Sequence, residues 1–316
     1  MTRILLIICL LHITLESWGQ ERFRVMTWNV ENLFDCRDDT MKQDEEFLPE
    51  SKRKWTWLRM RRKITDIGRV VMAVGGDRPP SLVALQEVEN DSVMNALTRS
   101  SALRTLGYDY IMTDSPDKRG VDVALMFRRE DFRILGWETR RVPSISYGLR
   151  PTRDILHAWG IVANGDTLHA IVCHLPSKAG CQRQGKRNRR LALATLASLC
   201  DSLLASGEGD RRLIVMGDFN SPLRELRPLR MLLPMTPDEK WPTEGTYRFR
   251  SNWSWIDHIM VSPALKDCTT EARIYSADWM QRPVADGTWY PRRTYQGTTY
   301  AGGVSDHLPI SCDLRL

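Results

Sequence analysis

LIVMGDFNSP, residues 213–222, is the stretch that decides the architecture of this chain. Its apolar start predicts a buried strand, which ends in Gly217, Asp218 and Asn220 before a Ser-Pro pair breaks it. Gly217 permits a tight turn of the backbone. Asp218 and Asn220 are two residues apart, so both side chains lie on the same side of an extended segment and can hold a water molecule or a phosphate oxygen. The alternative is an Asx turn, which needs only one of the two.

Three other apolar runs end in a polar residue in the same way. VMTWN ends in Asn29, LVALQE in Glu87 and AIVCH in His174. A buried carboxylate such as that of Glu87 is costly unless a cation compensates it, and Mg²⁺ takes oxygen ligands. The alternative for Glu87 is to cap the following turn. The question is whether the four strand ends meet.

Two further motifs place histidines beside carboxylates. In WIDHIMVSP, residues 255–263, strand alternation puts Asp257 and His258 on opposite faces, so we expect Asp257 at a site and His258 to be structural. In SDHLPIS, Asp306 and His307 precede the last predicted strand. Histidine exchanges a proton near neutral pH, and two histidines among carboxylates suit phosphoester hydrolysis.

The rest of the chain mixes hairpins with strand–helix–strand units. An Asn-Gly pair at residues 164–165 predicts a hairpin turn, and Asp91 is a candidate helix cap. We predict helices over 55–74, 91–106 and 186–204 and strands over 23–33, 81–88, 121–129, 155–163, 167–174, 212–217, 255–262 and 308–315. This pattern indicates an α/β fold with mixed sheets and outer helices, and two sheets packed face to face would explain why many strands are apolar on both sides.

Composition and the N-terminus bound the class of protein. The chain has 316 residues and a net charge of +6, which favours anionic partners such as phosphate esters, nucleic acid or anionic surfaces. Residues 1–19 read as a cleavable signal peptide, too short for a membrane span, so we expect an exported protein (periplasmic, surface or secreted) whose residues 20–316 form one domain. The alternatives are a membrane-proximal anchor or a lipoprotein signal at Cys9. We expect the cysteines to be mostly buried thiols, with at most one disulfide.

Seven motifs occur in a fixed order, namely WNVENLF, QEVEN, RGVDVAL, CHLPS, GDFNSP, IDHIMVS and SDHLPI. Together they resemble the endonuclease/exonuclease/phosphatase superfamily, from about Phe23 to the C-terminus. The resemblance implies a four-layer α/β sandwich, in which two packed mixed β-sheets are flanked by α-helices. It also implies that the four strand ends converge on one metal–phosphate site. At this site an activated water would attack phosphorus in line with the leaving group, and the cofactor would be Mg²⁺ or Mn²⁺.

The resemblance also assigns the metal ligands and the acid–base groups. The implied metal ligands are Asn29, Glu87 and Asp306. The implied catalytic residues are Asp218 and Asn220, which hold the attacking water and the phosphate, His307 as general base or phosphate-stabilising histidine, and Asp257, which orients His307.

A second histidine and an arginine complete the implied site. His174 matches the second histidine of the deoxyribonuclease-like members, and Asp122 is the residue expected to orient it. Arg153 is placed as the phosphate-binding arginine, and Arg150 competes for that role.

Three features bear on the substrate. Glu89 replaces an arginine that reaches DNA in deoxyribonuclease-like members, which argues against duplex DNA. A basic run at residues 178–190 is either a phosphate-contacting patch or the solvated start of a helix. An aromatic-rich segment, residues 279–300, either stacks on a base or packs a long loop.

We therefore predict a monomeric phosphodiesterase of the endonuclease type that acts on a phosphate ester, with nucleic acid among the candidates. The alternatives are an inositol- or lipid-phosphate hydrolase of the same superfamily and, as a different class, a catalytically inactive binding module. Retention of Glu87, Asp218 and His307 argues against the inactive module.

Overall fold

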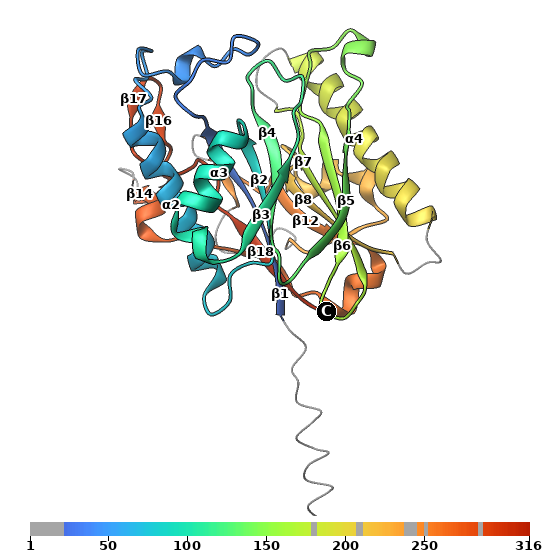
Figure 1. Ribbon diagram of the computed structural model, residues 1–316. Helices are drawn as coiled ribbons and strands as arrows, with labels where there is room; N and C mark the ends of the chain where they lie inside the picture. Colours follow the sequence, from blue (N-terminus) through green and yellow to red (C-terminus); the bar gives the residue numbers. More distant parts are fainter. Residues whose placement is uncertain (1–21, 178–181, 207–210, 237–244, 250–251, 284–286) are drawn as a thin grey trace, which may run out of the picture.

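The computed structural model describes residues 22–177, 182–206, 211–236, 245–249, 252–283 and 287–316. The predicted signal peptide lies outside these residues and stays a prediction. The described chain is built around two six-stranded mixed sheets (Figure 1).

The first sheet has the strand order β13-β18-β1-β2-β4-β3. β1 pairs in parallel with β2 and antiparallel with β18, and β4 is antiparallel to both of its neighbours. The bounds are β1 Arg22–Leu33, β2 Leu82–Val88, β3 Tyr108–Met112, β4 Asp122–Arg128, β13 Arg273–Ile274 and β18 Ile310–Arg315.

The second sheet has the order β5-β6-β7-β8-β12-β9, and β7–β8 is its parallel pair. Its bounds are β5 Arg133–Arg140, β6 Ile155–Ile161, β7 Thr167–His174, β8 Arg212–Asp218, β9 Leu233–Pro234 and β12 Asp257–Val261. The predicted hairpin joins β6 to β7, and Gly165 in its turn has a φ of 88°, which glycine adopts without steric cost.

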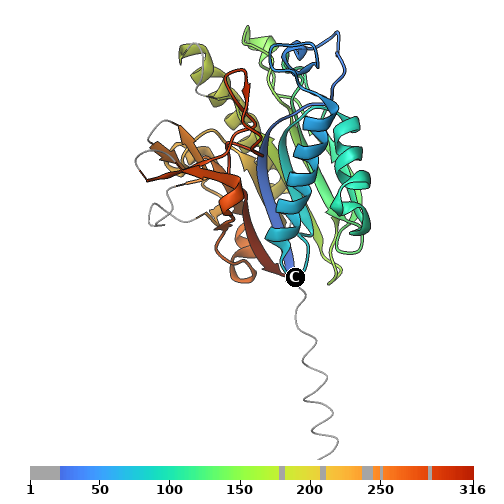
Figure 2. The ribbon, with the colours of Figure 1, turned by 90° about the vertical axis from the view of Figure 1, so that its left-hand side faces the viewer.

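Three apolar layers hold the sheets and helices together. Val25 of β1 and Ile214 of β8 belong to a buried cluster between the two sheets. The helices α2 Trp57–Gly75 and α3 Asp91–Ser100 cover the outer face of the first sheet, and α4 Gln182–Ala205 covers that of the second. Figure 1 shows this order of helices, sheet, sheet and helix, and Figure 2 looks onto the side that α2 and α3 cover. The predicted four-layer sandwich is confirmed.

Local differences from the sequence prediction have simple causes. The helix predicted over 91–106 ends at Ser100, and its N-cap is Asn90 rather than Asp91, because the Asn90 side chain accepts a hydrogen bond from Val93 N at 3.2 Å. The edge strand β5 was missed because its side chains are largely exposed and its short apolar stretch, residues 134–137, is followed by polar residues.

The shortest elements were also missed, because segments of two to six residues are too short to show periodicity. The short strands are β10 Tyr247–Phe249, β11 Asn252–Ser254, β14 Gln281–Pro283, β15 Trp289–Pro291, β16 Tyr295–Gln296 and β17 Thr299–Tyr300. The 3₁₀ turns are Glu45–Phe47, Ala102–Thr105, Ile145–Tyr147, Leu223–Glu225, Arg227–Leu229, Pro263–Cys268 and Asp278–Met280.

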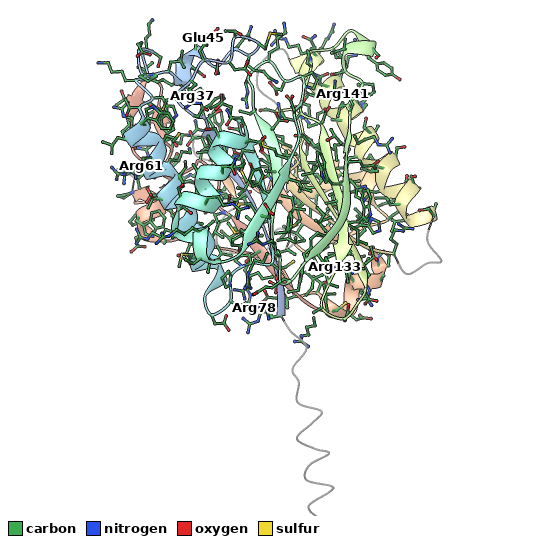
Figure 3. The ribbon with its side chains drawn as sticks, in the orientation of Figure 1. Arg37, Glu45, Arg61, Arg78, Arg133 and Arg141 are labelled. Atoms are coloured by element: carbon green, nitrogen blue, oxygen red, sulfur yellow. The ribbon has the colours of Figure 1, made fainter. Side chains whose placement is uncertain are left out.

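The outer surface is charged, as the outward side chains of Arg61 and Arg133 illustrate in Figure 3. The five cysteines in the described part of the chain are free thiols, and all but Cys268 are buried. Among the described helices, none combines the length and the apolar character that crossing a bilayer requires.

Candidate active site

Inward-facing side chains change from apolar to polar at one end of the sandwich. On β8, Met216 lies in the core between the sheets, and Asp218 follows it on the same face because strand side chains alternate. The same alternation turns His174 inward at the end of β7, Asp257 at the start of β12 and Asn29 on β1. The strands that build the core therefore also aim these polar groups into the gap between the sheets.

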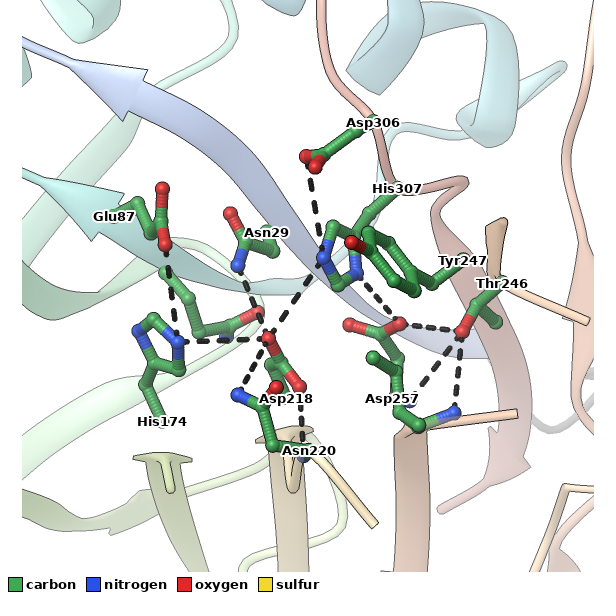
Figure 4. Close-up of polar contacts among 12 residues, drawn as sticks. Asn29, Glu87, His174, Asp218, Asn220, Thr246, Tyr247, Asp257, Asp306 and His307 are labelled. Atoms are coloured by element: carbon green, nitrogen blue, oxygen red, sulfur yellow. Dashed lines mark hydrogen bonds and ion pairs between the residues drawn. The ribbon is translucent and has the colours of Figure 1, made fainter. Parts of the chain in front are cut away.

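Strand pairing brings these ends together. His174 and Asp257 stand opposite Asp218 on the two neighbours of β8. Asn29 reaches across from the first sheet and donates from Nδ2 to Asp218 Oδ2 at 3.1 Å. Asn220 donates its backbone N–H to Asp218 Oδ1 at 2.8 Å. The strand ends thus converge on Asp218 (Figure 4).

His307 lies on one side of Asp218. Its Nδ1 is 2.9 Å from Asp257 Oδ2, and its Nε2 is 3.9 Å from Asp218 Oδ2. Thr246 donates its hydroxyl to the same oxygen of Asp257, and the Tyr247 ring packs against His307 with 4.7 Å between ring centroids. A carboxylate at Nδ1 leaves Nε2 facing the site, as acid–base chemistry requires.

Glu87 lies on the other side of Asp218. Its Oε1 accepts a hydrogen bond from Arg119 at 3.2 Å and is 3.9 Å from His174 Nε2. Its Oε2 accepts the backbone N–H of Asn32 at 3.0 Å. The pairing of β2 shifts register here, where Glu87 interrupts the ladder with β4.

The backbone around these groups is strained. Four residues that are not glycine, Glu31, Asn32, Glu87 and Asn220, have φ between 50° and 62°. Such left-handed conformations are uncommon for residues with a Cβ and persist only where the surroundings impose them. Strain of this kind gathers at functional sites.

The two histidines carry different charges at neutral pH. Burial lowers the pKa of His307, but Asp257 and then Asp218 outweigh it and raise that pKa to about 10. Burial and the charge of Arg153 hold the pKa of His174 well below its usual value. His307 is therefore an imidazolium. His174 is a neutral imidazole, and its Nδ1 has no hydrogen-bond partner in the described part of the chain.

The carboxylates also differ. Burial and the neighbouring Asp257 raise the pKa of Asp218 to about 7, against the opposing effect of His307. Burial acts in the same direction on Glu87, but nearby positive charges, first that of Arg119, keep its pKa below its usual range. Asp218 can therefore exchange a proton near neutral pH, while Glu87 stays ionised.

The donor chemistry of the cavity fits a hard divalent cation. Asp218, Asp257 and His307 each place one possible ligand atom within 4.8 Å of the others. The proton between His307 and Asp257 would compete with a cation at that position. The predicted ligands Asn29, Glu87 and Asp306 line the same cavity and offer the oxygen donors that Mg²⁺ or Mn²⁺ prefers.

The structure corrects the role expected of Asp122. Its Oδ1 accepts hydrogen bonds from Thr113 Oγ1 at 2.5 Å and from Ser115 N at 3.0 Å. It makes no hydrogen bond to His174, whose Nδ1 is unpaired within the described residues. Asp122 therefore fixes the turn before β4 and does not orient the histidine.

Of the two candidate arginines, Arg153 lines the cavity, whereas Arg150 is exposed outside it. Arg153 is held in place because it donates to Asp117 Oδ2 at 2.8 Å and to Leu175 O at 3.1 Å. Arg119, which was not predicted from the sequence, also lines the cavity. The sequence offered an indication of this residue, because Arg119 is the first residue of the RGVDVAL motif.

The position of Glu89 in the folded protein gives no reason to exclude DNA as a substrate. It does not line the cavity, and its Oε2 accepts the backbone N–H of Asp35 at 2.6 Å. Burial raises the pKa of Glu89 to about 8, so the group is largely neutral at pH 7. Of the basic run, Lys178 lies outside the described residues, and Arg189 is buried and donates to Pro176 O.

The family follows from a comparison of the whole chain. The Endonuclease/Exonuclease/phosphatase family model matches residues 24–315. The chain belongs to this family. The match spans β1 to β18 and so includes every residue of the site described above. No curated protein sequence is significantly similar to the chain.

Solved structures share the family fold at low sequence identity. A Bacteroides thetaiotaomicron protein of this family is 15% identical, covers 93% of this chain and 95% of its own, and has a TM-score of 0.59. Truncated TDP2 from Caenorhabditis elegans is 15% identical over 94% and 99%, with a TM-score of 0.61. A mannosyl-6-phosphatase from Bacteroides thetaiotaomicron is 17% identical over 92% and 99%, with a TM-score of 0.58. These similarities establish the fold.

Proposed function

We propose that this family member is an exported, divalent-metal-dependent phosphodiesterase of the nuclease type. The observation that carries the proposal is the convergence of two histidines on Asp218 Oδ2, with His174 Nε2 at 3.5 Å and His307 Nε2 at 3.9 Å. In-line hydrolysis of a phosphoester needs a base for the attacking water and positive charge for the phosphorane-like transition state. The cluster of Asp218, His174 and His307 supplies both the base and the positive charge.

Each residue around Asp218 has a separate role in the proposed hydrolysis. Asp218 accepts the proton of the attacking water, because its pKa of about 7 lets it exchange protons near neutral pH. Asn29 and Asn220 donate from their amides to Asp218 and keep its carboxylate aimed into the cavity. The His307 imidazolium, held by Asp257, neutralises charge on the phosphoryl oxygens, and neutral His174 borders the other side.

A divalent cation, bound by Glu87, Asp306 and Asn29, would supply additional positive charge to the phosphoryl group and the leaving oxygen. Export is proposed from the short apolar run after Arg3, and the net charge of +6 suits an anionic substrate.

A phosphomonoesterase is the second candidate. Arg53, Arg119 and Arg293 line the cavity and would suit additional phosphate groups, as in an inositol phosphate. The cleavage of a diester compared with that of a monoester discriminates the two proposals directly.

The test is hydrolysis by residues 20–316 of bis(4-nitrophenyl) phosphate, 4-nitrophenyl phosphate and supercoiled plasmid, with Mg²⁺ and with EDTA. We expect metal-dependent diester cleavage, reduced about 10²- to 10⁴-fold in His307→Ala. His157→Ala is the control, since His157 is a buried histidine that does not line the cavity. A folded protein that cleaves no phosphoester with Mg²⁺ or Mn²⁺, or an unimpaired His307→Ala variant, would contradict the proposal.

A further inference from the structure

Two arginines are paired with the carboxylates that are implied as metal ligands. Arg119 Nη2 lies 3.2 Å from Glu87 Oε1, and Arg293 Nη2 lies 2.6 Å from Asp306 Oδ2. Both arginines line the same cavity as these carboxylates, and Figure 4 shows Glu87 and Asp306 on either side of Asn29. Each guanidinium therefore contacts a carboxylate that a divalent cation would also use as a ligand.

In both pairs the carboxylate is more buried than the arginine. The exposed fraction of the side chain is 51% for Arg119 and 13% for its partner Glu87. It is 39% for Arg293 and 16% for its partner Asp306. Ion pairs with an exposed partner contribute little to stability, because water solvates the released charge well. Each arginine can therefore leave its carboxylate at small cost, while the carboxylate keeps its place.

The backbone that carries each arginine is held by hydrogen bonds. Arg119 donates its backbone N–H to Asp117 Oδ1 at 2.8 Å, and the carbonyl of Asp117 accepts the N–H of Gly120 at 3.1 Å. The carbonyl of Arg293 accepts the N–H of Gly303 at 3.0 Å. A change of partner therefore requires rotation about the side-chain bonds of the arginine and no rearrangement of the backbone.

Two other arginines of the cavity are paired with different acids. Arg153 is buried and donates to Asp117 Oδ2 at 2.8 Å. Arg53 Nη2 lies 3.0 Å from Glu46 Oε2. Neither acid is among the described residues that line the cavity. These two arginines add positive charge to the cavity but do not contact an implied metal ligand through these pairs, so they serve as an internal comparison.

We propose that Arg119 and Arg293 are built-in counter-ions, which compete with the divalent cation for Glu87 and Asp306 and bind the phosphate once the cation has displaced them. This inference rests on the proposed function and concerns how its cation and its substrate are coupled. A divalent cation repels a guanidinium and attracts a carboxylate more strongly than a single charge does. A guanidinium that leaves its carboxylate presents a planar pair of N–H donors, which suits phosphate oxygens. Cation and phosphate therefore strengthen each other's binding.

The test measures binding of Mn²⁺ and of inorganic phosphate to residues 20–316 by calorimetry. Without phosphate, Arg119→Gln and Arg293→Gln should each bind Mn²⁺ about 3- to 10-fold more tightly than the unmodified protein, because a competing positive charge is removed. In saturating Mn²⁺, both variants should bind phosphate about 10-fold more weakly, because a charged donor to the phosphate is lost. The two shifts have opposite signs, whereas a structural defect in the cavity would weaken both kinds of binding.

Arg53→Gln is the matched control, because it removes the same charge from the cavity lining while Arg53 is paired with Glu46. Its Mn²⁺ affinity should change by less than about 2-fold, because solvent and salt screen the more distant charge. Unchanged or weaker Mn²⁺ binding in both test variants would overturn the competition, as would an equal gain in Arg53→Gln or no Mn²⁺ binding by the unmodified protein.

The competition and the proposed activity fail separately. Phosphodiester cleavage by the unmodified protein, without tighter Mn²⁺ binding in Arg119→Gln and Arg293→Gln, would refute the competition alone. Tighter Mn²⁺ binding in both variants, without hydrolysis of any phosphoester by the unmodified protein, would support the competition and refute the proposed activity.

Discussion

Mild acid should weaken the fold through His258, the buried histidine on the outer face of β12. Its Nε2 lies 2.9 Å from Ser221 O and must donate, because a carbonyl only accepts. Its Nδ1 lies 3.0 Å from Thr236 Oγ1 and accepts the hydroxyl hydrogen. These two contacts hold the neutral imidazole and also secure the loop that follows Asp218 and Asn220.

The size of the expected loss of folding stability follows from the pKa of His258. Burial lowers the pKa of His258 from 6.5 to about 4, so the unfolded chain takes up the proton first as pH falls. The contribution of His258 to stability is therefore complete above pH 6.5 and decreases as pH falls from 6.5 towards 4. The linkage relation predicts a loss of about 2 kcal/mol at pH 5, approaching about 3 kcal/mol at lower pH.

Urea unfolding between pH 8 and pH 5 measures this loss. His258→Gln is the matched variant, because an amide can donate to Ser221 O and accept from Thr236 but does not titrate. The variant should lose about 2 kcal/mol less than the unmodified protein over this range, since the other titrating groups are common to both. Identical pH dependence in the two proteins would refute the argument that burial holds His258 neutral.

Two further predictions concern the site. Asp257→Asn removes the charge that does most to raise the pKa of His307, so that pKa should fall from its value of about 10, and the diester cleavage rate should fall about 10²-fold or more. An unchanged imidazole titration by NMR would contradict the pairing. Gly217→Ala should destabilise the protein by about 3 kcal/mol, since its φ is 152° and an added Cβ would lie 1.9 Å from Cys173 O. Gly165→Ala, which also has positive φ but meets no atom within 4 Å, should cost about 1–2 kcal/mol, and equal losses in denaturant would show that the steric argument is wrong.

Local patterns in the sequence predicted most of the fold, and they failed where the pattern is absent. Continuous apolar runs identified β1, β2, β4, β7 and β8, because strands covered on both faces need apolar side chains at every position. The edge strand β5 exposes Leu135 and Trp137, and its apolar stretch spans only residues 134–137. The hairpin β10–β11, which carries Phe249 and Trp253, is too short for any periodicity.

The sequence by itself determined which residues end the strands and which face each side chain takes, because backbone alternation is a local property with a period of two residues. That alternation alone places Asp257 and His258 on opposite faces of their strand. Only the tertiary structure decided which strand ends become neighbours and what each polar group contacts. Asp122 turns to Thr113 rather than to a histidine, and Trp28 Nε1 donates to the carbonyl of His307, 279 residues away. Such contacts depend on how the two sheets pack, and that is a property of the whole chain.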